Sequence, residues 1–316
     1  MGNTHKSLII RDMVFRPIKQ KKLNNSSINC LIRLKDNRIA TSSIDKTIYI
    51  FNPKKNYHCD FSFKVNKEEL NSIIQIDNGY LVSASLNYIE IWKIGQTSHE
   101  FLASYQVYKN INLNYPVEHI VALSNNRIAV EINPTILIYQ GDAPFQSTPI
   151  HKITFLQSEN IGLIYYQRER EIIISTALEK IYFWCAITYQ CICVLNFEKF
   201  TTFPLLSTFR YDKNVLILYL SSDLLFLDLI KWKIIKKMVI TKKEPFEYVI
   251  CGEMIKLRNN KILCGSYNGY IKLIDYENDS FIVIEKKSMK DTKGLLVVDD
   301  NTFISADSNS IIEWKY

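Results

Sequence analysis

Histidine and cysteine are the residues most often used for catalysis or metal binding, and here they form no recognisable site. The five histidines are scattered, and none belongs to an H-E-x-x-H motif or to a Ser/His/Asp set that spacing can identify. Cys191 and Cys193 are two residues apart, which places both on one face of a strand and does not match the C-x₂₋₄-C spacing of a zinc site. We therefore expect no metal, no cofactor and no catalytic residue.

Phosphate-binding loops are also missing from the sequence. Its nine glycines form neither a G-x-x-x-x-G-K-[ST] loop nor a G-x-G-x-x-G turn, so backbone amides have no visible phosphate cradle. His119 lies in an expected inner strand, and we interpret it as a structural residue.

The bulk composition is that of an ordinary globular chain, with 47% hydrophobic and 22% charged residues. A single core typically stops growing at about 250–300 residues, so 316 residues indicate two domains or one repetitive architecture. Seven scattered cysteines, an odd number, indicate free thiols in a reducing compartment. The first residues lack the features of a secretory signal, and the most apolar run, Val215–Leu220, is too short to span a membrane. A cytoplasmic location is expected.

One unit recurs seven times along the chain. Its best copy runs from Ile39 to Phe51, with a short apolar strand, a tight turn at Asp45 and a second strand that ends in an aromatic residue. The copies end in anchors spaced 40 to 47 residues apart, at Phe51, Trp92, Tyr139, Trp184, Asp228, Ile274 and Trp314. The first apolar residue of each strand pair lies 11 or 12 positions before its anchor. Two spacings that agree in seven copies indicate a repeat protein.

Each unit contains further strands on both sides of this pair. An apolar strand precedes the polar turn that opens the pair, and in the first six copies a more polar strand follows the anchor. Four short strands in each period of about 40–45 residues are the signature of a propeller blade. Residues 48–51 are apolar at successive positions, as expected of a strand that stacked blades cover on both faces. The sequence therefore predicts an all-β, seven-bladed β-propeller of four-stranded antiparallel blades.

The unit resembles the WD40 repeat. The segment SSIDKTIYIFN from Ser42 closely matches the pattern S-x-D-x-T-I-x-I-W of that family, and the resemblance extends from about Ile28 to Trp314. No copy has a WD dipeptide, no Gly-His pair precedes an inner strand, and only Asp45 clearly holds the structural Asp of the family. The blades are therefore expected to depend on burial instead of the buried His-Asp network of the family. The resemblance implies a divergent WD40-like propeller, a class that commonly receives peptides at the mouth of the central channel.

The ring needs a fourth strand for its last blade, because the seventh unit ends just after its third strand, at Tyr316. The segment Ser7–Ile18 has strand-like apolar residues and is expected to pair with the last blade and close the ring. A single domain over residues 1–316 is expected, with residues 1–27 as closing strand and linker. The blades are expected near residues 28–65, 70–108, 117–156, 161–197, 205–240, 249–287 and 293–316.

Acidic residues gather at the turns between second and third strands, which in this fold share one face and surround the channel mouth. The candidate partner-binding residues there are Asp45, Glu131, Glu179, Asp223 and Asp307, against the two bases Lys46 and Lys180. Asp also makes tight turns well, so a purely structural role is the alternative. Asp45 is interpreted as turn-stabilising, which makes Glu131, Glu179 and Asp223 the better candidates for binding.

A run of lysines forms a secondary basic patch on an expected outer strand and the loop after it. The run contains no acid and carries Lys231, Lys233, Lys236, Lys237, Lys242 and Lys243. Lysines on an exposed edge discourage strand pairing, which is one explanation for them. The other is an acidic partner or nucleic acid, since the whole chain carries a net charge of +7.

Together these features predict a non-catalytic interaction scaffold, a subunit or adaptor of a hetero-complex. It would bind a peptide or protein, of basic character, over the channel mouth; neither membrane nor nucleic acid is an expected partner. One alternative is a membrane-associated propeller, acylated at Gly2 or phosphoinositide-binding. Lys6 stands where myristoylation favours Ser or Thr, and residues 209–212 depart from a Phe-Arg-Arg-Gly motif. Another alternative is an enzyme or enzyme-complex subunit with a site in the central channel.

Overall fold

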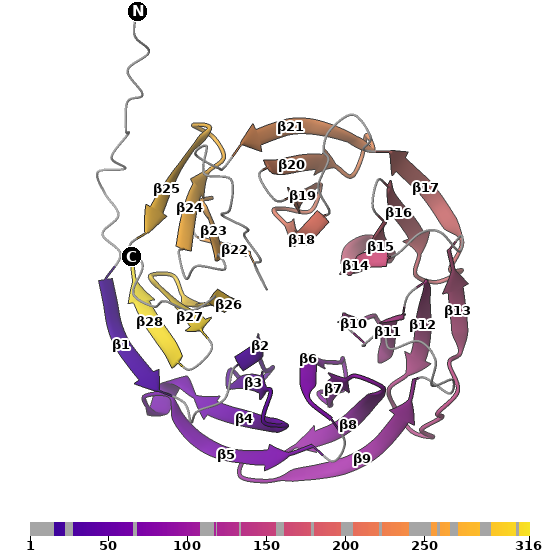
Figure 1. The fold of residues 1–316 in the computed structure, drawn as a ribbon, viewed down its shortest axis with the longest axis vertical. Coiled ribbons are helices and arrows are strands. Elements are labelled where there is room, and N and C mark those ends of the chain that lie inside the picture. Colours follow the sequence, from indigo (N-terminus) through magenta and orange to yellow (C-terminus); the bar gives the residue numbers. More distant parts are fainter. Residues whose placement is uncertain are drawn as a thin grey trace, which may run out of the picture.

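The computed structural model describes residues 16–22, 28–65, 68–107, 117, 119–132, 134–155, 161–177, 180–196, 205–220, 223–239, 254–257, 260–265, 271–284, 292–307 and 310–316. In these residues the strands β1 to β28 form seven four-stranded sheets. The sheets stand around a central axis, each with one strand near the axis and one at the rim (Figure 1). The predicted all-β, seven-bladed propeller is confirmed.

In blades one to six the strands follow one another in chain order from the axis to the rim (Figure 1). Blade one contains β2 (Ile28–Arg33), β3 (Ile39–Ser43), β4 (Thr47–Asn52), the 3-10 helix η1 (Pro53–Lys55) and β5 (His58–Lys64). Blade two contains β6 (Leu70–Gln75), β7 (Leu81–Ser85), β8 (Tyr88–Ile94) and β9 (His99–Gln106). Blade three contains β10 (Ile120–Ala122), β11 (Arg127–Ile132), β12 (Thr135–Gln140) and β13 (His151–Thr154).

The other blades repeat this plan. Blade four contains β14 (Ile161–Gln167), the 3-10 helix η2 (Arg168–Arg170), β15 (Ile172–Ala177), β16 (Lys180–Cys185) and β17 (Cys191–Asn196). Blade five contains β18 (Leu205–Arg210), β19 (Val215–Leu220), β20 (Asp223–Asp228) and β21 (Lys233–Val239). Blade six contains β22 (Ile255–Lys256), β23 (Ile262–Gly265), β24 (Ile271–Asp275) and β25 (Ser280–Ile284). Blade seven contains β26 (Thr292–Asp299), β27 (Thr302–Asp307), β28 (Ser310–Lys315) and, at the rim, β1 (Arg16–Lys22).

The N-terminal strand closes the ring, as the sequence predicts. β1 pairs antiparallel with β28, from Arg16 opposite Lys315 to Lys22 opposite Ser310. The strand lies further along the chain than the apolar segment from which closure was predicted, whose first residues, 7–15, lie outside the described part. An outermost strand needs little apolar surface and tolerates proline and lysine, so RPIKQKK suits this position better than SLIIRDM.

The core is distributed around the ring because each blade packs against its neighbours. In β3, β7 and β27 every residue is buried, so both faces of these strands are covered. The rim strands β5, β9, β17 and β21 contain exposed residues throughout. One apolar cluster joins Phe226 of blade five, Leu263 of blade six and Trp314 of blade seven. A core of this kind grows with the number of blades, which accounts for a chain longer than one ordinary core.

The anchor residues hold the second and third strands of each blade together. Five of them lie directly opposite the apolar residue that opens the second strand, in the pairs Ile39–Phe51, Leu81–Trp92, Ile128–Tyr139, Ile262–Ile274 and Phe303–Trp314. Three tryptophan indoles donate to a serine hydroxyl on the neighbouring strand, Trp92 to Ser83 at 3.0 Å, Trp184 to Ser175 at 2.8 Å and Trp314 to Ser305 at 2.8 Å. Burial of a polar indole is therefore compensated in these blades.

Turns between first and second strands use residues that tolerate a left-handed backbone. Asn37, Gly79 and Asn260 have positive φ angles of 69°, 88° and 63° at these turns. In blade four the short helix η2 replaces the simple turn. The residue that follows it, Glu171, has a φ of 50°. Asn and Gly adopt this conformation at low cost, which is why polar turn residues mark the repeat so clearly.

Candidate functional site

The two faces of the ring differ in what their turns carry. Strands alternate in direction, so the turns between second and third strands share one face, here called the upper face. The turns between first and second and between third and fourth strands share the opposite, lower face. Four of the five candidate acids are described, and each lies at the upper end of its blade.

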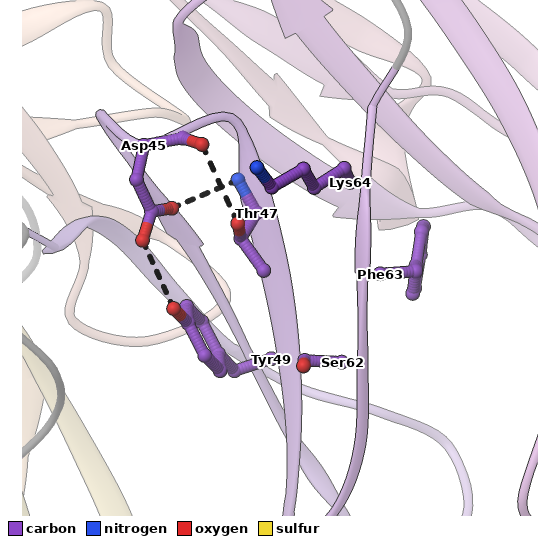
Figure 2. Close-up of a pocket in the computed structure, with 6 residues that line it drawn as sticks. All are labelled: Asp45, Thr47, Tyr49, Ser62, Phe63 and Lys64. Carbon is purple, nitrogen blue, oxygen red and sulfur yellow. Dashed lines mark hydrogen bonds between the residues drawn. The ribbon is translucent and has the colours of Figure 1, made fainter.

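Asp45 stabilises its own turn between β3 and β4, as the sequence predicts for it. Its carboxylate accepts hydrogen bonds from the backbone N–H of Thr47, at 3.0 Å, and from the Tyr49 hydroxyl, at 2.9 Å (Figure 2). Burial, followed by this hydrogen bond, raises the pKa of Tyr49, so the phenol remains a donor at neutral pH. Lys46 follows with a positive φ of 66°, which completes the tight turn.

An open hollow of about 370 Å³ lies beside this turn on blade one. It is lined by Asp45, Thr47, Tyr49, Ser62, Phe63 and Lys64, and Lys64 extends from β5 toward the turn (Figure 2). The Asp45 carboxylate is part of the wall but is engaged by Thr47 and Tyr49. The hollow therefore offers polar groups of both signs and no concentrated negative charge.

Glu131 is placed differently from what its position in the repeat implies. It belongs to strand β11, not to the turn after it, and is only 2% exposed. Its backbone N–H donates to the carbonyl of His119 at 3.0 Å, which ties it to the inner part of blade three. His119 is largely enclosed, and this burial lowers its pKa to about 4. A neutral imidazole at this place fits the structural role expected for His119.

Asp223 and Asp307 are also engaged within their own blades. Asp223, the first residue of β20, forms an ion pair with Lys237 of β21 at 2.8 Å, and its side chain is 10% exposed. Asp307, the last residue of β27, accepts the backbone N–H of Ser310 at 2.6 Å and is 7% exposed. Both carboxylates thus support a hairpin. Glu179 lies outside the described residues.

Two apolar residues on the upper face were missed by the sequence reasoning. Ile44 and Leu86 are each 41% exposed and directly follow the serine that ends the second strand of blades one and two. Asp45 and Asn87 stand next to them in the same turns. The signal was present in SSI and ASL, because a tight turn has no need of a large aliphatic side chain.

The lower face uses its arginines to join neighbouring blades. In three blades an arginine at the start of the second strand reaches the turn between third and fourth strands of the next blade. Arg38 of blade one donates to the carbonyls of Gly95 (2.7 Å) and Gln96 (3.0 Å). Arg127 of blade three donates to the carbonyl of Ala186 and to the Tyr189 hydroxyl (2.8 Å). Arg170 of blade four donates to the carbonyl of Leu229 (2.7 Å). Arg38 is only 5% exposed. These charges therefore hold the ring together and leave little for phosphate binding.

Three of the four described lysines of the expected basic patch lie beside acidic residues. Lys236 pairs with Asp279 of blade six at 2.8 Å, and its ammonium lies 4.3 Å from the centre of the Tyr276 ring. Lys237 pairs with Asp223, while Lys231 lies 3.9 Å from Asp228. Lys233 is exposed at the start of β21. Lys242 and Lys243 lie outside the described residues.

Neither a metal-binding cluster nor a membrane-spanning helix occurs in the described part of the chain. There, no group of three or more His, Cys, Asp or Glu side chains could hold a metal ion. The helices of this part are short 3-10 turns, and none is long and apolar enough to cross a membrane.

Comparison with known proteins identifies the fold. No protein-family model and no curated protein matches the sequence. Among solved structures, the WD40 β-propeller domain of Doa1 is similar to 95% of this chain and 97% of that domain, with a TM-score of 0.70 and 13% sequence identity. Identity at this level carries no information about partners. The chain is a seven-bladed β-propeller with the fold of WD40 domains.

Proposed function

We propose that the chain is a non-catalytic scaffold that binds a protein or peptide on the upper face, over blades one and two. Propellers of the WD40 fold generally serve as protein-interaction scaffolds. The observation that carries the proposal is the pair Ile44 and Leu86, which stand at equivalent turns of adjacent blades with 41% of each side chain exposed. Apolar side chains of this size on a rigid frame are suitable anchors for a partner.

We expect the acids of the upper face to contribute less to partner binding than the sequence implies. Asp45 borders Ile44, and its carboxylate already accepts from Thr47 and Tyr49. Lys46 and Lys64 stand near it, so a basic partner residue would gain little from charge alone. We expect a partner segment with apolar side chains that contact Ile44 and Leu86. Membership of a hetero-complex follows if that partner is another protein.

Quantitative affinity purification tests this proposal. The chain is compared with the double variant Ile44→Ser/Leu86→Ser, with Asp45→Asn, and with Ile230→Ser as a control. Ile230 is 59% exposed but lies in the turn between β20 and β21 on the lower face. Two lost anchors of about 1.4 kcal/mol each correspond to about a hundredfold weaker binding, so the double variant should lose its main partners.

Thermal unfolding of each variant separates binding from folding. The double variant should unfold within a few degrees of the unaltered chain, since exposed substitutions usually change stability by about 0.5 kcal/mol or less. Partners that survive the double substitution but disappear with Ile230→Ser would place the binding surface on the lower face and refute the proposal. Glu179→Lys tests the remaining acid candidate, whereas Asp223 is unsuitable because its reversal would break the pair with Lys237.

A further inference from the structure

The outermost strand of blade four, β17, contains no charged residue, unlike five of the seven rim strands. Apart from Lys180, the first residue of β16, the hairpin of β16 and β17 contains no Asp, Glu, Lys, Arg or His over residues 181–196. Three of its side chains are among the most exposed large apolar ones in the described residues, Ile187 at 66%, Ile192 at 51% and Val194 at 45%. In a chain with 22% charged residues, such a hairpin at the periphery requires an explanation.

Strand β17 is the outermost strand of its sheet, so one of its edges has no neighbour within the sheet. Exposed edges are normally protected by charge or proline, because unpaired N–H and C=O groups recruit other strands. Among the seven rim strands, charged residues occur in β1, β5, β9, β13 and β21, while β17 and β25 have none in their described span. β17 therefore has neither charge nor proline along its edge.

The side chains of β17 divide between the two faces of the sheet. Cys193 and Leu195 pack against the apolar cluster shared with blade five. Val194 lies directly opposite Tyr182, so both project from the other face, where Tyr182 stacks with Trp184. Ile192 lies at a register shift between Cys191 and Cys193 and is exposed. Tyr182 and Trp184 pack against Phe155 of blade three, so the side chains exposed beside the edge are the apolar Ile192 and Val194.

We propose that the β17 edge binds an extended segment of another protein by strand addition, a segment with a β-branched apolar centre and acidic ends. Main-chain hydrogen bonds along the edge would supply affinity, and contacts with Ile192 and Val194 would select apolar side chains. The rim strands β13 and β21 lie on either side of β17 (Figure 1). Each carries an exposed lysine, Lys152 on β13 and Lys233 on β21. Acidic ends complement these flanks.

A second copy of the chain is a poorer occupant for the same reason. Edge-to-edge pairing of two copies would bring lysines of β13 and β21 toward each other, and each copy carries a net charge of +7. The rim surface is also separate from Ile44 and Leu86, which lie in turns of blades one and two. Binding at the β17 edge can therefore be confirmed or refuted independently of the proposed function.

A labelled peptide of stated sequence tests the proposal. The probe is a fluorescent, end-blocked Glu-Glu-Val-Thr-Ile-Thr-Val-Glu-Glu, with two control peptides that replace the glutamates by lysine or the central isoleucine by proline. Binding to the full chain is measured by anisotropy and by hydrogen exchange of residues 191–196. The probe should bind and protect β17. The lysine-ended peptide should bind at least tenfold more weakly, and the proline peptide should not bind, since proline removes a donor and fits poorly in a strand.

Matched variants locate the contact. Ile192→Ser/Val194→Ser should weaken binding at least tenfold, while Ile235→Ser/Val239→Ser, the same change at exposed positions of β21, should leave it unaltered. Circular dichroism verifies that both variants fold. The proposal is overturned if the proline peptide binds equally well, if both variants bind like the unaltered chain, or if the unaltered chain is a dimer that Ile192→Ser/Val194→Ser converts to a monomer.

Discussion

Blades four and five share one architecture, but the rim strand of blade four is uncharged whereas that of blade five carries lysines. Their third and fourth strands pair in the same register, with Phe183 opposite Cys193 in one and Phe226 opposite Lys236 in the other. At the next position Val194 opposes Tyr182, and Lys237 opposes Leu225. Where blade five has lysines, blade four thus has Cys and Val. The inner strands of a blade are constrained by burial, whereas the rim strand is open to other requirements.

The first test concerns the shared core and has the largest expected effect. Phe183 and Phe226 are both 0% exposed at equivalent positions, so Phe183→Ala and Phe226→Ala should each lower the free energy of unfolding by about 3–5 kcal/mol. Urea unfolding followed by tryptophan fluorescence measures both. A difference of more than about 2 kcal/mol between them, the spread of comparable core truncations within one protein, would show that the two blades differ in their cores as well as their rims.

The second test concerns the link between these blades. Arg170 of blade four donates to the carbonyl of Leu229 and to the Asn214 side chain of blade five, at 2.7 and 3.1 Å. Arg170→Ala should therefore cost about 1–2 kcal/mol, as expected for charge-assisted hydrogen bonds. Arg210→Ala is the control, because its partner Glu169 has a half-exposed carboxylate and such pairs contribute about 0–1 kcal/mol. Equal losses for both variants would contradict a special role for Arg170.

The third test exchanges the two rims. Lys237→Val removes the partner of the largely buried Asp223 and should cost about 1 kcal/mol, discounted because Lys237 is itself 41% exposed. Val194→Lys places a lysine at an exposed site and breaks no ion pair, because valine carries no charge. It should change stability by about 0.5 kcal/mol or less. Thermal unfolding at low and high salt measures both. If Val194→Lys proved the more damaging, Val194 would be part of the core.

The fourth test compares thiols of blade four and has the smallest effect. The hydrogen bond from Thr188 lowers the pKa of Cys185, whereas burial raises that of the neighbouring Cys191. Because the thiolate is the nucleophile, Cys185 should be alkylated faster than Cys191 near about pH 8, although Cys191 is the more exposed. Peptide mapping after timed iodoacetamide labelling gives the rates. Cys264, whose burial raises its pKa to about 12, should remain unlabelled; faster labelling of Cys191 would contradict the hydrogen-bond argument.

The fold was predictable in detail because its signals are local. The left-handed Asn37 and Gly79 and the anchors Phe51 and Trp92 act within one hairpin, so their spacing is visible in the sequence. The turn-stabilising role of Asp45 was predictable for the same reason, since its partners lie two and four residues away. The closing strand was predicted in role but not in position, because closure requires only a strand that fits the edge of β28.

The candidate site was harder to predict because exposure depends on neighbouring blades. Glu131 has the sequence position of a turn acid, yet it lies in β11 and is 2% exposed. Ile44 and Leu86 are of residue types typical of a core, yet they lie in turns and are each 41% exposed. Whether a side chain faces solvent is decided by packing between blades, which spacing along one chain does not encode.

Periodicity by itself determined the seven blades, their order and their tight turns, because each repeat folds through contacts within about 40–45 residues. The tertiary structure decided which charges remain available. The six-lysine run looks uniformly basic in sequence, but Lys237 meets Asp223 across a hairpin and Lys236 meets Asp279 on the next blade. The sequence of β17 is uncharged, but only the tertiary structure places it at the outer edge of its sheet. Charge and exposure become properties of a surface only when strands distant in sequence lie side by side, and the ring is what brings them together.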